Sequence, residues 1–343
     1  MPSRKKATTV HDLLEQLSDE QRARLKPTPH PAWTEPMLAK LTKKRFSDPD
    51  WLFERKLDGE RALAFRQDDE VRLLSRNRKE VDASYPELVE ALGRQPCRDF
   101  VADGEIVAFE GHLTSFARLQ GRMQTRDSKA ARASGIAVFF YLFDLPYLAG
   151  YDLSALSLRR RKALLREAIA FEDPIRFTPH PNRDGEAFLR EACEEGWEGL
   201  IAKRASGPYR HRRSPDWLKL KCTRGQELVI GGFTAPKGSR EGFGALLLGY
   251  YEDGRLRYAG KVGTGFDYDF LVKMRGRLDD LARGRSPYAE QVGEATATFV
   301  EPELVAEIEF TEWTEAGRLR HPRFLGLRRD KAARDVTRER PES

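Results

Sequence analysis

The sequence contains few cysteines and no long apolar run. Its three cysteines, Cys97, Cys193 and Cys222, lie far apart and form no CxxC pair. This odd number at wide spacing argues against a disulfide framework and a structural zinc site, and it predicts a reducing compartment. No stretch approaches the ~20 apolar residues of a membrane-spanning helix, and no apolar segment follows the basic start as in a secretory signal. We therefore expect a cytoplasmic protein.

Charge is more informative than composition in this chain. Hydrophobic residues make up 40% of the sequence, which is ordinary for a globular protein, and 343 residues allow two or three domains. The net charge is +6, and the positive excess peaks between Lys203 and Arg224, where eight basic residues accompany one acid, Asp216. Such a patch fits a polyanionic partner, although a charge run alone is more often a solvated surface.

Three regions follow one another along the chain. Residues 1–30 form a polar extension, with a short amphipathic helix followed by a proline-rich connector that cannot be helical. Residues 31–222 predict an α+β domain with largely antiparallel sheet. Its expected strands are 62–66, 71–75 and 137–145, with a tight hairpin inside 100–109, and its expected helices are 85–92, 158–170 and 185–195.

Glycine-rich strands characterise the remaining region, residues 223–343. Five strands and one inserted helix predict a small Greek-key barrel of the OB-fold type. The expected strands are 228–233, 245–251, 256–262, 297–300 and 305–310, and the helix spans 268–283. The predicted fold class is thus α+β, with an OB-fold β-barrel as the C-terminal domain.

The strongest chemical signal is the string Lys56-Leu57-Asp58-Gly59-Glu60-Arg61, which follows an apolar stretch. A lysine amine becomes a nucleophile when desolvation and nearby cations lower its pKa. The glycine permits close backbone approach to a phosphate. Without further matches, a charged surface turn would be the better explanation of the string.

Further motifs follow in order and together resemble the covalent nucleotidyltransferase superfamily, and within it the ATP-dependent DNA ligases. The resemblance runs from about Pro36 to Lys331 and is strongest to the ligase component of bacterial end-joining ligases, in a stand-alone form. The KxDGxR motif at Lys56 is followed by the remaining family motifs: Ser75-Arg76-Asn77, Asp103-Gly104-Glu105, Phe143-Asp144-Leu145, Glu198 to Lys203, Trp217 to Lys221, and the RxDK motif from Arg328 to Lys331.

The resemblance implies a role for each motif residue. Lys56 would take AMP from ATP, and Asp58, Lys219 and Lys221 would join it in catalysis. Glu198 would bind Mg²⁺ or Mn²⁺, and Arg76 would hold the DNA 5′-phosphate. Phe143 would stack on adenine, and it could at the same time be a core aromatic. The other expected nucleotide contacts are Glu54, Arg61, Glu105, Lys203, Arg328 and Lys331, the last two reaching the site through a hinge near residues 222–226.

The implied reaction has three steps: adenylation of the enzyme, transfer of AMP to the 5′-phosphate of DNA, and attack by the 3′-hydroxyl. We expect a monomer that binds nicked double-stranded DNA near the bacterial nucleoid, with end-binding or repair proteins as candidate partners. No helical DNA-binding domain precedes the predicted core. We therefore hypothesise that the extension contacts DNA through its basic residues Arg4, Lys5, Lys6, Arg22, Arg24 and Lys26.

Two other classes of protein stay open at this point. An RNA ligase or an mRNA capping guanylyltransferase shares much of the motif set, and labelling by ATP or by GTP distinguishes these enzymes. A non-catalytic OB protein would bind nucleic acid through the basic patch without forming a covalent nucleotide. The presence of Lys56, Glu105, Glu198, Lys219 and Lys221 together counts against simple binding.

Overall fold

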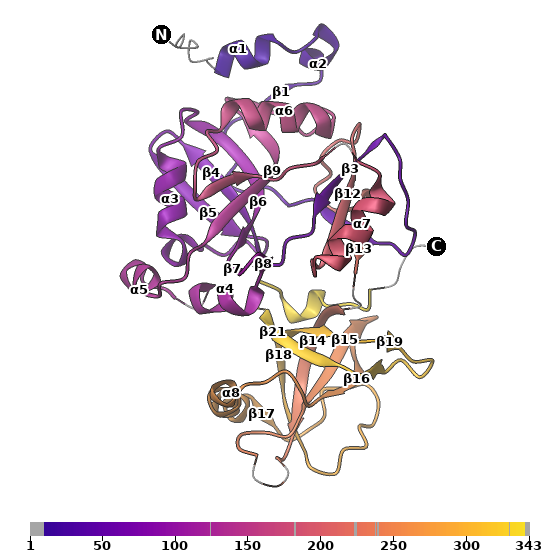
Figure 1. Ribbon diagram of the computed structural model, residues 1–343. Coiled ribbons are helices and arrows are strands. Elements are labelled where there is room, and N and C mark those ends of the chain that lie inside the picture. The colour runs from indigo at the N-terminus through magenta and orange to yellow at the C-terminus, as the bar shows by residue number, and fades with distance from the viewer. Residues whose placement is uncertain are drawn as a thin grey trace. The chain divides into compact units, whose positions relative to one another are not determined.

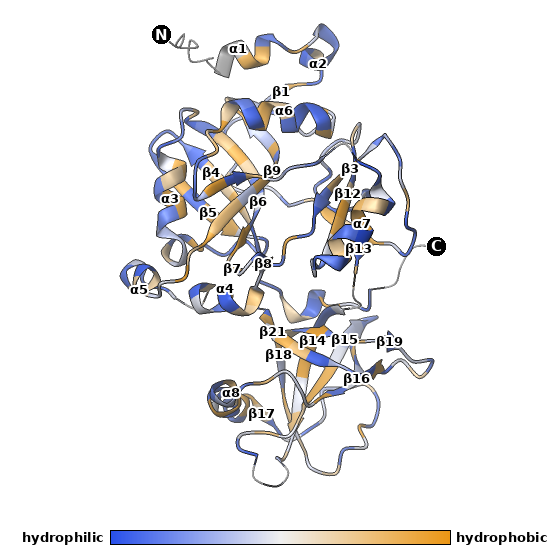
Figure 2. Cartoon of the chain, viewed as in Figure 1, coloured by the Kyte–Doolittle hydropathy of each residue, from blue (hydrophilic) through white to orange (hydrophobic). Residues whose placement is uncertain are grey.

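A computed structural model describes residues 10–339, except 124, 182, 223–224, 237, 239 and 329, and the backbone alone for residues 10–12. The chain divides into two compact units, and the first ends at Cys222. Each unit has its own apolar core. The strands are the most hydrophobic segments of both units, as Figure 2 shows. No helix within the described ranges is long and apolar enough to cross a membrane.

The N-terminal segment packs on the first unit. Helix α1 (Val10–Glu15) buries Leu13, and the following Leu17 is also buried in the main core. Ser18 caps the short helix α2 (Asp19–Ala23), and β1 (Lys26–Pro27) pairs with β10 (Tyr151–Asp152). Residues 13–27 are therefore attached to the first unit by apolar contacts and by strand pairing.

A large sheet forms the body of the first unit (Figure 1). Its order is β1-β10-β9-β6-β4-β5, and β11 also pairs with β9. All pairs are antiparallel except β11 with β9. The remaining bounds are β4 (Glu60–Gln67), β5 (Glu70–Ser75), β6 (Asp99–Val107), β9 (Phe139–Leu148) and β11 (Ile175–Phe177). Its surrounding helices are α3 (Pro86–Gly93), α4 (Phe116–Met123), α5 (Ser128–Ala133) and α6 (Leu158–Ala168).

One local prediction in this sheet is wrong. Residues 100–107 continue as the single strand β6 instead of turning back at Asp103-Gly104. Gly104 serves close packing here, because an added Cβ would lie 2.6 Å from the ring of Phe140. The register against β9 shifts at this point, and the tight hairpin comes later, between β7 (Phe109–Glu110) and β8 (Leu113–Thr114).

A second, smaller sheet has the order β2-β13-β12-β3. Its strands are β2 (Leu38–Leu41), β3 (Trp51–Arg55), β12 (Gly199–Arg204) and β13 (Arg213–Lys221). Helix α7 (Gly185–Glu194) packs against it through Phe188, Leu189 and Ala192. The chain leaves this sheet after β3 and enters the large sheet at β4, so the segment from Lys56 to Gly59 connects the two sheets.

The second unit has the OB-fold, with five main strands and one long helix. These are β14 (Gly225–Thr234), β15 (Leu246–Glu252), β16 (Arg255–Val262), β18 (Ala297–Glu309), β21 (Arg323–Arg328) and α8 (Tyr268–Asp280). The sheet order is β16-β15-β14-β18-β17, where β17 is Ala282–Arg283, and β21 also pairs with β18. A short separate pair joins β19 (Glu312–Trp313) to β20 (Leu319–Arg320).

The number of main strands agrees with the prediction, but their assignment does not. The segments 297–300 and 305–310 belong to one strand, β18, which continues through Pro302. Its pairing with β14 shifts register at this place, so the proline lies where no regular ladder partner is required. The fifth strand is instead β21, just before the RxDK motif.

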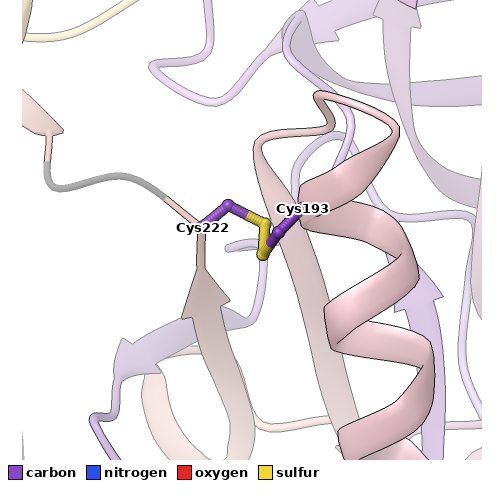
Figure 3. The surroundings of a disulfide bond; sticks show 2 residues. All are labelled: Cys193 and Cys222. Atoms are coloured by element: carbon purple, nitrogen blue, oxygen red, sulfur yellow. A yellow bond between two sulfur atoms is a disulfide. The ribbon is translucent and has the colours of Figure 1, made fainter.

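A disulfide joins Cys193 to Cys222, which corrects the prediction that the cysteines stay unpaired (Figure 3). Cys193 lies in α7 and Cys222 follows β13, and the small sheet brings their Cα atoms to 5.2 Å. The two residues are separated by 29 positions in the sequence, so their spacing alone does not reveal the pair. Cys97 is free and buried.

We expect this disulfide to stabilise the first unit by about 3.5 kcal/mol, since closing a loop of this length removes that much conformational entropy from the unfolded chain. Denaturant unfolding of the oxidised protein should show Cys193→Ser to be less stable by this amount. Adding a reductant should lower the stability of the wild type to that of the variant. Cys97→Ala is the control and should keep the response to reductant. An oxidised wild type no more stable than Cys193→Ser would refute the prediction.

Candidate active site

Lys56 lies where the chain passes from the small sheet to the large one. Its backbone N–H donates to the Gly199 carbonyl at 2.8 Å, which ties the residue to the start of β12. Three residues later, an added Cβ on Gly59 would lie 2.2 Å from the Ile106 carbonyl oxygen. Only glycine fits this approach, so the Gly of the KxDG string allows the connection to lie against β6.

Basic side chains surround the carboxylate of Glu198 beside Lys56. Glu198 immediately precedes β12 and forms an ion pair with the Lys56 ammonium, and Lys221 Nζ lies 3.9 Å from its other oxygen. The Cys222 backbone N–H donates to the Glu198 carbonyl at 3.0 Å, which holds this residue against the end of β13. Lys219 and Lys221 alternate along β13, as the sequence indicated. The structure thus brings Lys56, Glu198, Lys219 and Lys221 together.

The electrostatics of this cluster differ from the expectation for Lys56. Burial acts to lower the pKa of Lys56, but the Glu198 carboxylate outweighs it and the pKa is raised. Burial likewise acts to raise the pKa of Glu198, and the charges of Lys56 and Lys221 lower it instead. The prediction of a lowered pKa at Lys56 is therefore not met in this structure, because the nearest charge is an anion.

A second, fully buried cluster surrounds Glu54, the last but one residue of β3. Its two carboxylate oxygens lie 2.5 Å from Lys162 Nζ and 2.5 Å from Lys203 Nζ. The Lys203 ammonium also lies 3.9 Å from the centroid of the Phe143 ring. Burial lowers the pKa of Lys203 to about 8, although Glu54 opposes this. Lys203 therefore lies between the Phe143 ring and the Glu54 carboxylate, two groups that the sequence also assigned to the nucleotide.

Lys162 was missed from the sequence. It lies in α6, and it occupies the same buried face as Leu158 and Leu165 at helical spacing. A lysine in an apolar helical stripe is unusual, because a buried ammonium requires a partner. That irregularity is the signal that could have identified it.

Arg61 is held in place by a residue for which the sequence suggested no role of its own. Two of its guanidinium nitrogens each lie 2.6 Å from an oxygen of Asp103, a bidentate pair. Asp103 also accepts a hydrogen bond from the Tyr209 hydroxyl at 2.7 Å. The Arg61 guanidinium carbon lies 4.4 Å from the centroid of the Phe143 ring. Phe143 itself is buried among Met37, Tyr209 and Trp217, so it is also a core aromatic.

Three more residues of the predicted site, Asp58, Glu105 and Arg76, lie in the first unit. Asp58 accepts from the Phe116 backbone N–H at the start of α4, at 3.3 Å. Glu105 lies opposite Arg61 in the β4–β6 ladder. The Arg76 backbone N–H donates to the Arg61 carbonyl at 3.1 Å, which places this residue just beyond β5.

The RxDK residues form ion pairs within the second unit. Arg328 donates to both carboxylate oxygens of Asp330, at 2.8 and 2.7 Å, and Lys331 lies 2.8 Å from Glu227. Arg328 and Lys331 thus pair with residues of their own unit. Of the predicted hinge, residues 223–224 lie outside the described ranges.

Two family models match this chain. Residues 36–221 match the family described as ATP dependent DNA ligase domain, and residues 239–331 match the ATP dependent DNA ligase C terminal region. The chain is 42% identical over 324 residues to the multifunctional non-homologous end joining protein LigD of Pseudomonas aeruginosa, covering 92% of this chain and 38% of that protein.

A mycobacterial relative shows similar identity and coverage. The end joining DNA repair protein LigD of Mycobacterium tuberculosis is 37% identical over 295 residues, covering 84% of this chain and 37% of that protein. The solved structure of mycobacterial DNA ligase D complexed with ATP and MES matches with a TM-score of 0.63 and 35% identity, covering 89% of this chain and 98% of that one. The chain thus spans less than two fifths of these multifunctional relatives.

Proposed function

Because this chain belongs to the ATP-dependent DNA ligases, we propose that Lys56 is its nucleophile and carries AMP from ATP to DNA. The observation that carries this assignment is the place of Lys56, at the connection between two sheets and beside Glu198, Lys219 and Lys221. Phosphoryl transfer spreads negative charge over the transferred group, and preorganised cations stabilise that charge.

In the first step the Lys56 amine attacks the α-phosphorus of ATP. A nitrogen–phosphorus bond forms, the bond to the pyrophosphate oxygen breaks, and the ammonium proton is lost to solvent or a base. Lys56 must leave its ion pair with Glu198 before its lone pair is available. Lys219 and Lys221 then balance charge on the phosphate, because both extend from the same face of β13.

Glu198 fits the role of a divalent-cation ligand. It is a partly exposed carboxylate, with 23% of the side chain accessible, and it lies among lysines that suit substrate phosphates. Mg²⁺ is commonly held by one or two protein carboxylates together with phosphate oxygens, and Mn²⁺ accepts the same ligands. When bound, the ion would supply Lewis-acid neutralisation of the phosphate charge.

The nucleotide base and sugar are assigned to the buried cluster beside Lys56. Phe143 offers a ring on which the adenine can stack. Glu54 lies near that ring, since Lys203 contacts both residues, and it is fixed between Lys162 and Lys203. Arg61, held by Asp103, is placed to contact the ribose together with Glu105. Arg328 and Lys331 would act on the leaving pyrophosphate after a movement of the second unit.

DNA enters in the second and third steps. The 5′-phosphate at a nick attacks lysyl-AMP, so a phosphorus–oxygen–phosphorus bond forms and the nitrogen–phosphorus bond to Lys56 breaks. The 3′-hydroxyl then attacks the activated phosphate, loses its proton and releases AMP. Arg76 is proposed to hold the 5′-phosphate, since a planar guanidinium binds it with two bonds. Asp58 is proposed to act near the 3′-hydroxyl or the metal ion.

The similarity to LigD proteins supports repair of broken DNA as the cellular task, with end-binding proteins as partners. We further propose that the protein acts as a monomer at the nucleoid. Neither capping nor simple binding by an OB-fold explains the family matches of both units.

The function is tested by sealing of a nicked duplex. With Mg²⁺ and ATP, we expect the chain to convert a labelled nicked strand to full-length product, and with GTP in place of ATP we expect none. Denaturing gel electrophoresis measures both. Activity with GTP as high as with ATP would favour a guanylyltransferase. Binding of DNA without any sealed product would favour the non-catalytic protein.

A further inference from the structure

A basic pocket lies on the first unit, outside the cluster around Lys56. Its volume is about 460 Å³. Three segments distant in sequence meet there, because β1 pairs with β10 and places Lys26 opposite Asp152. The lining residues are Arg24, Lys26, Asp152, Ser154, Ala155, Pro208, Tyr209, Arg210, His211 and Arg212.

Positive charges outnumber negative charges in the lining of this pocket. Four Arg and Lys side chains line it, against the single carboxylate of Asp152. Arg24 pairs with Glu20 at 2.6 Å, an exposed pair of the kind that is weak and easily exchanged. Arg210 pairs at 2.8 Å with Asp216, whose side chain is partly buried. Within the part of the chain that the structure describes, Lys26 and Arg212 have no ion-pair partner. These two exposed cations are available to an anion.

The loop that carries Arg212 is held firmly from both sides. The two ring nitrogens of His211 lie 3.1 Å from the Ser154 hydroxyl and 3.0 Å from the Glu35 carbonyl oxygen. Tyr209, two positions before His211, is buried, and its hydroxyl donates to Asp103, the partner of Arg61. The pocket therefore shares the Tyr209 side chain with the site that holds Arg61.

We propose that this pocket binds backbone phosphates of the DNA duplex, with Lys26 and Arg212 as the main contacts and Arg24 and Arg210 in support. The proposal rests on the proposed function and adds a binding site that lies outside the ligase motifs. Phosphate oxygens only accept hydrogen bonds, which suits a wall of lysine and arginine donors. Contacts of this kind position a duplex without reading its sequence.

The test compares the wild type with Lys26→Ala/Arg212→Ala in binding of a nicked duplex at several salt concentrations. Each lost phosphate contact lowers the slope of log K against log salt by about 1, so the double variant should have a slope lower by about 2. Its affinity at 0.1 M salt should fall about 10- to 100-fold. Labelling of Lys56 by ATP without DNA should stay at the wild-type level, which reports an intact fold.

Arg94→Ala/Lys129→Ala is the matched control, because it removes the same charges from exposed positions outside the pocket. Equal weakening in both double variants would show a general charge effect and refute the pocket. A Lys26→Ala/Arg212→Ala protein with wild-type affinity and slope would also refute it, as expected if an acidic protein were the occupant. Loss of ATP labelling by a double variant that unfolds at the wild-type denaturant concentration would assign the pocket to the nucleotide phosphates and refute the proposal. If the wild type binds DNA but takes no label, the proposed function fails, while the salt slopes still decide the pocket.

Discussion

Replacing Lys56 with alanine should abolish labelling of the protein by α-labelled ATP and lower nick sealing by on the order of 10⁴-fold or more. We expect no other lysine of the cluster to substitute, because Lys219 and Lys221 are fixed within the β12–β13 ladder, whereas Lys56 lies in the connection between the two sheets. The measurement is a gel of the protein after incubation with Mg²⁺ and labelled ATP, followed by addition of nicked DNA. Wild-type label should leave the protein as sealed product appears.

A purified protein that already carries AMP would take up no label, so the assay is repeated after treatment with pyrophosphate, which reverses the first step. Lys129→Ala, an exposed lysine in α5, is the control and should behave as wild type. A nicked substrate adenylated in advance bypasses Lys56, since the last step forms no bond to it. Lys56→Ala should therefore still seal that substrate. Covalent label on the alanine variant would place the nucleophile elsewhere.

Replacing Glu198 with alanine should slow lysine adenylation by about 10²- to 10³-fold and raise the Mg²⁺ concentration that gives half the maximal rate. The reason is that the proposed metal ligand is lost from among Lys56, Lys219 and Lys221. The rate of labelling is measured over a range of Mg²⁺ concentrations. Glu194→Ala, which removes an exposed carboxylate at the end of α7, is the matched control and should leave both quantities unchanged.

The two possible roles of Glu198 give opposite results in this experiment. If its only function were to hold Lys56 in an ion pair, removing the carboxylate would free the amine and raise the rate of labelling. A faster variant with unchanged Mg²⁺ dependence would therefore contradict the metal-ligand role. Glu198→Gln adds a further distinction, because it keeps the shape of the side chain while removing its charge.

Short-range features of this protein could be predicted well from the sequence. The strand pair 62–66 and 71–75, helix α6 and the strand β9 follow from apolar periodicity and from turn residues between them. The wrong predictions concern glycine and proline, which occur both in turns and at irregular positions inside strands. Gly104 packs against Phe140 instead of making a turn, and Pro302 lies within a long strand at a register shift. Glycine and proline indicate an unusual backbone position, but only the pairing with the neighbouring strand shows whether that position is a turn or a register shift within a strand.

What the sequence determined by itself was the identity and the order of the chemical groups. The motif residues Lys56, Glu198, Lys219 and Lys221 were all recognisable, because each motif spans only a few consecutive residues. The tertiary structure alone decided which groups are partners. Lys162 meets Glu54, Asp103 holds Arg61, Cys193 joins Cys222, and Lys26 meets Arg212 around one pocket. Such partners depend on strand register and helix packing between distant segments, which local sequence patterns do not encode.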